Sequence, residues 1–328
     1  LSALEALLRY YTIVTFNGIG YDAPLITLAL EGASNGALKS ASDAIIVTGI
    51  KHWDIARPPE WIDHIDMIEV APGQGSLKAY AARMHSKRLQ DLPIEPSAII
   101  GPVERQQLRE YCRLGDIAAT TDLFHTFPKQ LALRRGMGRQ YGLDLRSKSD
   151  AQIAEAVMRK ILPFKVEKPP IAFGQRFMYR PPEWLAFQHL TVLDLLARSP
   201  FTIADSGSPT MTEELAATRI QIGAGSYQMG SGGLHSTESE VLYDSDDTHV
   251  IVIADVASYY PSLILRTGIY PKQIGPEFAT IYRGWYDRRL AAKAAGDKRV
   301  ADSLKTLLNG TFGKLGSPWS IFYAPSEM

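Results

Sequence analysis

The sequence is poor in cysteine, in long apolar runs and in net charge. A single cysteine, Cys112, occurs in 328 residues, which excludes an internal disulfide and a zinc site built from cysteines. No run of about 18 apolar residues is present, so we expect no transmembrane helix and no membrane partner. The start of the chain lacks a signal-peptide pattern. These absences favour a reducing compartment, and we expect a cytoplasmic location.

Charge is balanced over the whole chain. Lys and Arg together number 35, as do Asp and Glu, so composition by itself does not indicate a polyanionic partner. Residues 271–316 differ, because nine basic residues stand there against four acidic ones. A basic run of this kind suits a nucleic-acid surface, but it is equally common on a solvated helix face.

The first half of the chain predicts one strand and several helices. Residues 12–16 favour a buried strand, and the glycine-containing segment 17–20 favours a turn before a helix. We predict further helices over residues 104–126 and 145–161. Prolines are frequent from residue 163 to residue 182, and we place the end of the first domain in that passage.

The second half begins with a connector and ends in a helical hairpin. Residues 201–247 are rich in Ser, Gly and Thr, which predicts a connector with short strands. Residues 249–254 form a continuous apolar run, typical of a central buried strand. We predict helices over residues 277–295 and 298–312. The Ala-Gly-Asp turn at 295–297 makes them an antiparallel pair.

Residues 255–262, Asp-Val-Ala-Ser-Tyr-Tyr-Pro-Ser, carry the strongest chemical signal. An aspartate at the end of a buried strand can project into a crevice, and Mg²⁺ prefers such hard oxygen ligands. The following turn exposes backbone N–H groups that suit a triphosphate, and Tyr260 offers a flat wall for a sugar. The alternative is a strand that simply ends in Asp255 and turns at Pro261.

The predicted hairpin carries a second signal. Lys305, Asn309 and Phe312 share one face of a helix, and offer a cation for phosphate, an amide and an aromatic plane. Arg289 and Lys293 lie four residues apart on the preceding helix. The alternative is a basic amphipathic hairpin with Phe312 in a core.

Taken together, these segments resemble family B DNA polymerases. Residues 255–262 resemble motif A, D-x-x-S-L-Y-P-S, and residues 305–313 resemble motif B, K-x-x-x-N-S-x-Y-G. The resemblance implies a catalytic, metal-binding palm aspartate in Asp255, and a steric gate against ribose in Tyr260. The residues that it implies for nucleotide binding are Ser258, Tyr259, Tyr260, Arg289, Lys293, Lys305, Asn309 and Phe312.

Three residues depart from the family pattern. Tyr259 replaces a leucine, Gly310 a serine and Phe312 a tyrosine. The missing hydroxyl at Phe312 removes a hydrogen bond to the minor groove or the backbone, so we expect an effect on fidelity more than on chemistry.

The first half resembles the 3′–5′ exonuclease of the same family. Residues 17–22 resemble the second exonuclease motif, N-x-x-x-(F/Y)-D, and residues 76–80 the S-L-x-x-h motif that holds single-stranded primer ends. The resemblance makes Asp22 and Asp116 catalytic metal ligands. The residues that it implies for DNA binding are Asn17, Ser76, Leu77, Lys78, Gly232 and Gly233, the last two in a segment similar to the family's Y-x-G-G connector.

The third exonuclease motif, Y-x-x-x-D, fits imperfectly. Tyr111 stands five residues before Asp116, and Cys112 occupies the strict tyrosine position. Either a one-residue bulge restores Tyr111 as the catalytic tyrosine, or water activation is impaired. Regular helix geometry favours Cys112 on the face of Asp116.

Two family motifs, D-x-E and D-T-D, are absent, so we expect an internal fragment. Asp244 and Asp246 resemble D-T-D only superficially, and we expect a solvated turn there. The predicted fold is α/β: an RNase H-like exonuclease domain, then a partial palm with a helical-hairpin fingers element. The predicted boundaries are 1–180 for the exonuclease, 181–247 for a connector, 248–276 for the palm with motif A, 277–315 for the fingers with motif B and 316–328 for the truncated return to the palm.

The implied function is template-directed DNA polymerisation with 3′–5′ proofreading. The resemblance implies Mg²⁺ or Mn²⁺ as cofactor, and a DNA primer-template and dNTPs as partners. The spacing of fifty residues between Asp255 and Lys305 leaves no room for the insertion of the protein-primed branch, so we expect a viral or phage-type enzyme with an ordinary primer, working in a bacterial or virus-infected cell. We expect the fragment to be inactive alone. The alternatives are a nuclease only, or a non-catalytic nucleic-acid-binding remnant.

Overall fold

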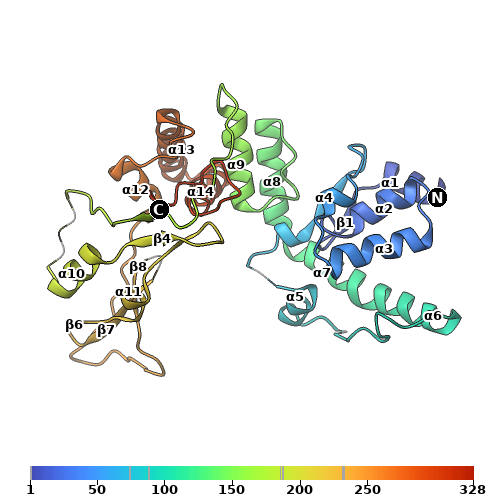
Figure 1. Cartoon of the computed structure of the whole chain (residues 1–328), viewed down its shortest axis with the longest axis horizontal. Coiled ribbons are helices and arrows are strands. Elements are labelled where there is room, and N and C mark those ends of the chain that lie inside the picture. Colours follow the sequence, from blue (N-terminus) through green and yellow to red (C-terminus); the bar gives the residue numbers. More distant parts are fainter. Residues whose placement is uncertain (1, 74, 88, 185, 187, 231–232) are drawn as a thin grey trace. The chain divides into compact units, whose positions relative to one another are not determined.

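The computed structural model describes residues 2–73, 75–87, 89–184, 186, 188–230 and 233–328. The fold is mixed α/β, mainly helical with small sheets (Figure 1). The chain divides into two compact units, Leu1–Ser149 and Asp150–Met328. By this division residues 150–180, which we assign to the exonuclease domain from the sequence, lie in the second unit. No helix of the described residues is long and apolar enough to cross a bilayer.

The first unit is built around a pair of parallel strands. Strand β1 (Ile13–Thr15) pairs with β2 (His64–Asp66), and Thr15 lies opposite Asp66. The predicted strand is thus present, although half-buried rather than buried. Apolar side chains from β2, α5 and α7 pack beneath the pair, with Leu123 fully buried. The helices before α6 are α1 (Ser2–Tyr10), α2 (Asp22–Leu30), α3 (Asn35–Ile46), α4 (His52–Ile55), the short 3₁₀ helix Met67–Glu69 and α5 (Leu77–Arg83).

The predicted helix 104–126 is continuous but irregular. Helix α6 (Pro102–Tyr111) runs into a π turn, Cys112–Asp116, and then into α7 (Ile117–Thr126). A π turn inserts one extra residue into the helical repeat. Helix α8 (Pro128–Tyr141) follows and ends at Gly142, which adopts a left-handed conformation with φ 65°.

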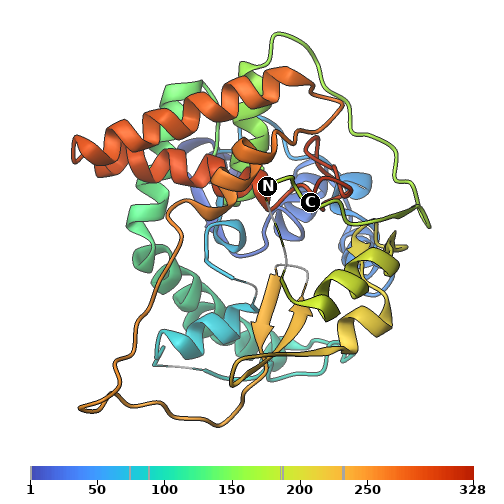
Figure 2. The same cartoon turned by 90° about the vertical axis from the view of Figure 1, so that its left-hand side faces the viewer.

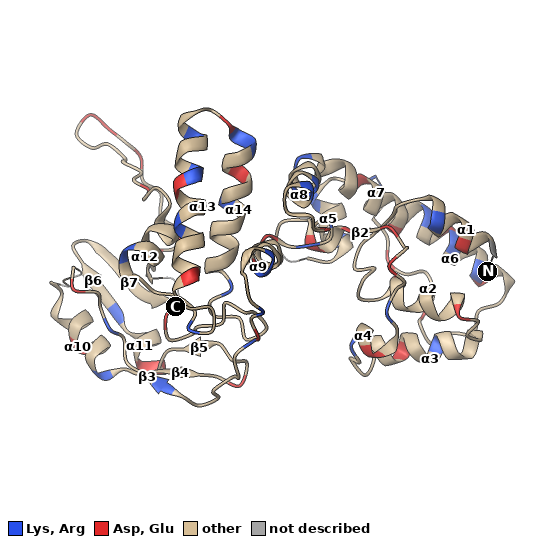
Figure 3. Cartoon of the chain, turned by 90° about the horizontal axis from the view of Figure 1, so that it is seen from above, with Lys and Arg blue, Asp and Glu red and all other residues tan. Residues whose placement is uncertain are grey.

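The predicted hairpin in the second unit is confirmed. Helix α13 (Pro276–Ala294) and α14 (Lys298–Phe312) lie side by side, with Gly296 at φ 73° in the turn (Figures 2 and 3). The Tyr282 hydroxyl donates a hydrogen bond to the Leu308 carbonyl at 3.0 Å and links the two helices. Figure 3 shows charges of both signs along the pair.

Helix α9 (Asp150–Ile161) packs against α14 and explains one departure from motif B. A Cβ atom at Gly310 would lie 2.4 Å from the Asp150 carbonyl oxygen and 3.0 Å from the Ala151 Cα. The serine of the family pattern would therefore collide with the first turn of α9. The predicted helix 145–161 is confirmed, with a start five residues later.

Two small antiparallel sheets follow α9, as expected for the predicted connector. The first has the order β3-β4-β5 and the second the order β6-β7-β8. Helix α12 (Tyr259–Thr267) then leads to the hairpin. The other elements of this region are β3 (Arg176–Phe177), α10 (Leu190–Arg198), β4 (Phe201–Ile203), β5 (Pro209–Thr210), α11 (Glu213–Ala217), β6 (Arg219–Ile222), β7 (Gly225–Gly230) and β8 (Gly233–Ser236).

The predicted central strand at 249–254 is wrong. These residues form neither helix nor strand, and their trace is plain coil (Figure 2). The side chains of Val250 and Ile253 are 80% and 93% exposed. Apolar residues make a buried strand only where a neighbouring strand takes up the backbone hydrogen bonds. No described strand pairs with this segment.

Candidate active sites

The first unit contains a cavity of about 840 Å³. Its lining comes from four separate stretches of the chain: β1 with the following turn and the start of α2, Ile68 in the 3₁₀ helix, the start of α5, and the π turn with α7. The structure thereby brings together residues that the sequence assigns to an exonuclease site. The predicted residues that line it are Asn17, Asp22, Ser76, Leu77, Lys78 and Asp116.

The cavity also has apolar lining residues, which sequence reasoning missed. They are Phe16 after β1, Ile68, and Ile117 and Phe124 on α7. The spacing of Asp116, Thr120 and Phe124 along one helix face is the signal that could have revealed them. The cavity lining therefore combines carboxylates with aromatic and aliphatic side chains.

A tight turn places Asn17 and Asp22. Asn17 adopts φ 63°, which is left-handed, and a Cβ atom at Gly18 would lie 2.1 Å from the Thr15 hydroxyl oxygen. Glycine is thus required directly after the strand. The Ala23 N–H donates to the Gly18 carbonyl at 2.7 Å, so α2 begins within the turn and Asp22 stands at its first position.

Asp66 is a second residue that sequence reasoning missed. It is 1% exposed, and its carboxylate accepts hydrogen bonds from the backbone N–H groups of Asn17 and Ile19, both at 2.8 Å. Burial raises the pKa of the Asp22 carboxyl, and the negative charge of Asp66 raises it further. A cation beside Asp22 would oppose both effects.

The fit of this site to a divalent metal is partial. Asp22 and Asp116 offer the hard oxygen ligands that Mg²⁺ prefers. Among the described residues, no group of three or more His, Cys, Asp or Glu side chains could hold a metal ion. Among the described residues that line the cavity, the carboxylates are those of Asp22 and Asp116.

A π turn separates Tyr111 from Asp116. Tyr111 is 8% exposed, whereas Cys112 is exposed. Burial raises the pKa of the Tyr111 phenol and of the Cys112 thiol, and the charge of Asp116 raises both further. The argument that favours Cys112 assumes a regular α-helix, and the π turn removes that premise. Both Tyr111 and Cys112 therefore lie near enough to Asp116 to feel its charge.

The predicted DNA-binding residues near α5 already have local partners. The Ser76 hydroxyl accepts a hydrogen bond from the Ala79 N–H at 3.2 Å and so caps α5. The Lys78 ammonium lies 2.8 Å from the carboxylate of Asp91, an exposed ion pair. A phosphate at Lys78 would therefore compete with Asp91 for the same ammonium.

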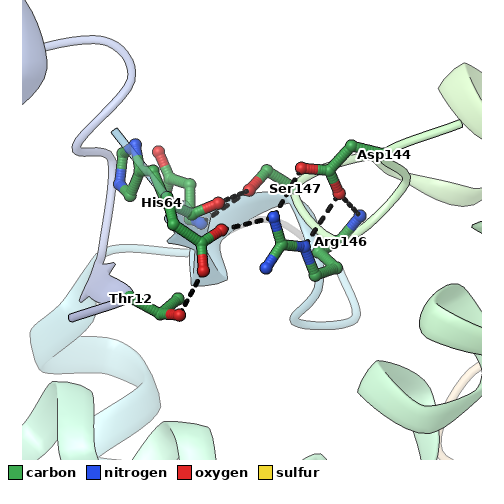
Figure 4. Close-up of polar contacts among 7 residues, drawn as sticks. Thr12, His64, Asp144, Arg146 and Ser147 are labelled. Carbon is green, nitrogen blue, oxygen red and sulfur yellow. Dashed lines mark hydrogen bonds and ion pairs between the residues drawn. The ribbon is translucent and has the colours of Figure 1, made fainter. Parts of the chain in front are cut away.

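A polar network supports β2 from its outer side (Figure 4). Arg146 donates to Asp63 at 2.5 Å and to Asp144 at 2.7 Å, and these bonds hold the pKa of each carboxyl below its usual value. Thr12 also donates to Asp63. His64 shares a hydrogen bond of 2.6 Å with the Thr15 hydroxyl, and burial lowers the pKa of its imidazole.

In the second unit, residues 258–260 and the hairpin meet at two points. Arg289 on α13 donates to the Ser258 hydroxyl at 2.6 Å, and Tyr260 stacks on Phe312 with ring centroids 4.1 Å apart. Ser258 adopts φ 55° and its side chain does not cap α12. Arg289 is 8% exposed, and its Nε atom has no partner among the described residues.

Other predicted residues are not drawn into this group. Asp255 is exposed on the coil segment before α12, and Lys293, Lys305 and Asn309 are exposed on the hairpin. Tyr259 lies beside Tyr260, with ring centroids 5.4 Å apart. Gly233 begins β8, and Gly232 lies outside the described residues.

No family model matches the chain, and neither the curated proteins nor the solved structures include a significant match.

Proposed function

We propose that the chain is part of a family B DNA polymerase, with a 3′–5′ exonuclease site in its first unit and the first part of a polymerase site in its second. The observation that carries this proposal is the cavity. Six residues match short sequence patterns of the family and line one cavity of the first unit: Asn17, Asp22, Ser76, Leu77, Lys78 and Asp116. The RNase H-like and palm folds belong to the same proposal.

In the exonuclease site, Asp22 and Asp116 would hold Mg²⁺ or Mn²⁺, which supplies an activated water and charge stabilisation when bound. Tyr111, whose pKa is raised by burial and by the charge of Asp116, would lie beside this carboxylate. Asn17 and Lys78 border the cavity and offer an amide and an ammonium to the sugar-phosphate chain. Phe124 offers a stacking surface for an unpaired base, which suits single-stranded DNA.

In the polymerase site, the start of α12 would receive the phosphates of a dNTP. Backbone N–H groups at a helix N-terminus attract anions, and the buried guanidinium of Arg289 adds an unpartnered N–H nearby. The stacked pair Tyr260 and Phe312 provides a flat wall beside this position. DNA primer-template and dNTPs are accordingly the proposed ligands.

Binding of a single-stranded oligonucleotide with Mn²⁺ tests the exonuclease part. A 3′-phosphorothioate oligonucleotide resists cleavage and reports binding by fluorescence anisotropy. We expect Lys78→Ala to weaken binding several-fold. The matched control is Lys39→Ala, because Lys39 is also an exposed lysine paired with an aspartate, Asp43 at 2.6 Å, but does not line the cavity. Equal effects of the two substitutions would contradict the proposal.

The exposed coil that carries Asp255 favours a second candidate, a nuclease whose residues 250–328 only clamp DNA. In that case the chain binds oligonucleotide but no dNTP. Titration of the chain with a fluorescent dNTP distinguishes the two, because Arg289→Ala should weaken dNTP binding only if the start of α12 holds phosphates. A remnant that binds nucleic acid without catalysis would bind oligonucleotide equally well with Asp22→Ala and in the absence of divalent cations.

A further inference from the structure

We propose that Asp66 is the positioning residue of the cavity: its buried carboxylate holds the turn 17–20 in the conformation that directs Asn17 and Asp22 toward the cavity. The control of the turn stands on the contacts of Asp66 alone. Its effect on ligand binding rests on the proposed exonuclease function.

The carboxylate of Asp66 is surrounded by backbone donors. One oxygen accepts from the N–H groups of Asn17 at 2.8 Å and Ile68 at 3.2 Å, and the other accepts from the Ile19 N–H at 2.8 Å. A buried carboxylate is costly unless hydrogen bonds or cations compensate it. Here three N–H groups do so, and two of them belong to the turn. Both oxygens are therefore engaged in shaping the chain.

The conformation of the turn determines the position of Asp22. The sheet register sets Asp66 opposite Thr15, the last residue of β1. The chain must reverse immediately afterwards, through the left-handed Asn17. Helix α2 then starts from the Gly18 carbonyl. A change in the Asn17 and Ile19 contacts would therefore shift the first turn of α2, which carries Asp22.

Asp66 is itself held in place from the outer side of the strand pair. Its backbone N–H donates to the Ser147 hydroxyl at 2.9 Å, and that hydroxyl donates to the His64 carbonyl at 3.3 Å (Figure 4). Arg146, the preceding residue in the chain, bonds to Asp63. The segment after α8 thus fixes both ends of β2, and Asp66 extends this support to the turn.

Amide hydrogen exchange tests the control of the turn. In the unaltered chain, the N–H groups of Asn17 and Ile19 should exchange slowly although neither lies in a helix or strand. Asp66→Asn should accelerate their exchange at least about tenfold, because an amide cannot accept at both positions. Asp63→Asn is the matched control: it makes the same change three residues earlier, and its partners are Arg146 and Thr12 rather than the turn.

The exchange results of the unaltered chain and the two variants are read together. Rapid exchange of Asn17 or Ile19 in the unaltered chain would overturn the proposal, even if Asp66→Asn does not fold. So would slow exchange that Asp66→Asn leaves unchanged, or slow exchange that both variants lose. Slow exchange that is lost in Asp66→Asn but kept in Asp63→Asn supports the proposal.

Ligand binding adds a measurement that a purely structural role would not change. With the fold intact by circular dichroism, Asp66→Asn should bind Mn²⁺ and the phosphorothioate oligonucleotide about 10-fold more weakly, the scale seen for residues that orient a metal ligand. Asp63→Asn should bind both normally. If the unaltered chain binds no oligonucleotide, the exonuclease function fails while the exchange result still decides the role of Asp66. Normal binding by Asp66→Asn would overturn its positioning role.

Discussion

Two aspartate-bearing segments of the chain share a sequence pattern and differ in structure. Each is an apolar stretch followed by a turn and a helix: residues 12–22 lead to Asp22, and residues 249–260 pass through Asp255. The first is a strand with a parallel neighbour, β2, and its turn is bonded to Asp66. The second is exposed coil. An apolar run thus becomes a strand only when a distant part of the chain supplies its partner.

The largest expected effect concerns primer extension, where we expect no activity from this chain. Phosphoryl transfer depends on metal ions held in a fixed position, and Asp255 lies on an exposed coil segment that pairs with no described strand. Extension of a labelled primer-template with Mg²⁺ and dNTPs is the measurement. Robust primer extension that is lost in Asp255→Ala would mean that Asp255 is held in position as Asp22 is, and that the two segments do not differ in this respect.

The hairpin offers a stability test within the second unit. A Cβ atom at Gly310 would meet the backbone of α9, whereas a Cβ atom at Gly284 on α13 would meet nothing within 4 Å. Gly310→Ala should therefore lower the free energy of unfolding by about 1–3 kcal/mol, as overpacking does. Gly284→Ala should raise it by up to about 1 kcal/mol through helix propensity. Urea denaturation measures both, and similar values would show that α9 does not constrain position 310.

The features predicted from sequence are those encoded by neighbouring residues. Helices α13 and α14 follow from local periodicity and from the glycine turn at Gly296, and both lie within about a residue of the prediction. The turn after β1 follows from its asparagine and glycines. Asp66 was missed because its partners lie 47 and 49 residues away. A one-residue bulge before Asp116 is one of the two alternatives that the sequence leaves open. The sequence does not decide for it, because the five residues of the π turn have no pattern that distinguishes them from an α-helix.

Nucleotide affinity tests whether the hairpin belongs to a site. Lys305 and Lys298 are both exposed on α14, and Lys298 lies at its first position near the turn. Lys305→Ala should weaken dNTP binding by more than the roughly 1 kcal/mol of an exposed ion pair. Lys298→Ala should change it little. Equal losses would mean that the hairpin is a basic surface and that the motif B assignment is wrong.

The smallest expected effect is a loss of stability in mild acid, and it concerns only the strand pair β1 and β2. Burial lowers the pKa of His64 below its usual 6.5, so the folded protein favours the neutral imidazole. The contribution of His64 to the free energy of unfolding is therefore complete above about pH 6.5 and is lost as the pH falls through its folded-state pKa. Asp63 and Asp144 act in a lower window. Their pKa values are lowered chiefly by hydrogen bonds from Arg146, so their contribution is lost only below about pH 4.

Urea denaturation at several pH values between about 7 and 5 covers the window of the histidine, because Asp63 and Asp144 remain ionised there. We expect His64→Gln to flatten the fall in stability over this range. His125→Gln is the matched control, since His125 is exposed on α7. The second unit should not share the effect of His64→Gln: exchange of the Leu308 N–H, within α14 where the Leu308 carbonyl accepts from the Tyr282 hydroxyl, should keep the same pH dependence. If His64→Gln leaves the pH dependence of stability unchanged, the strand pair does not depend on the neutral imidazole that hydrogen-bonds to Thr15.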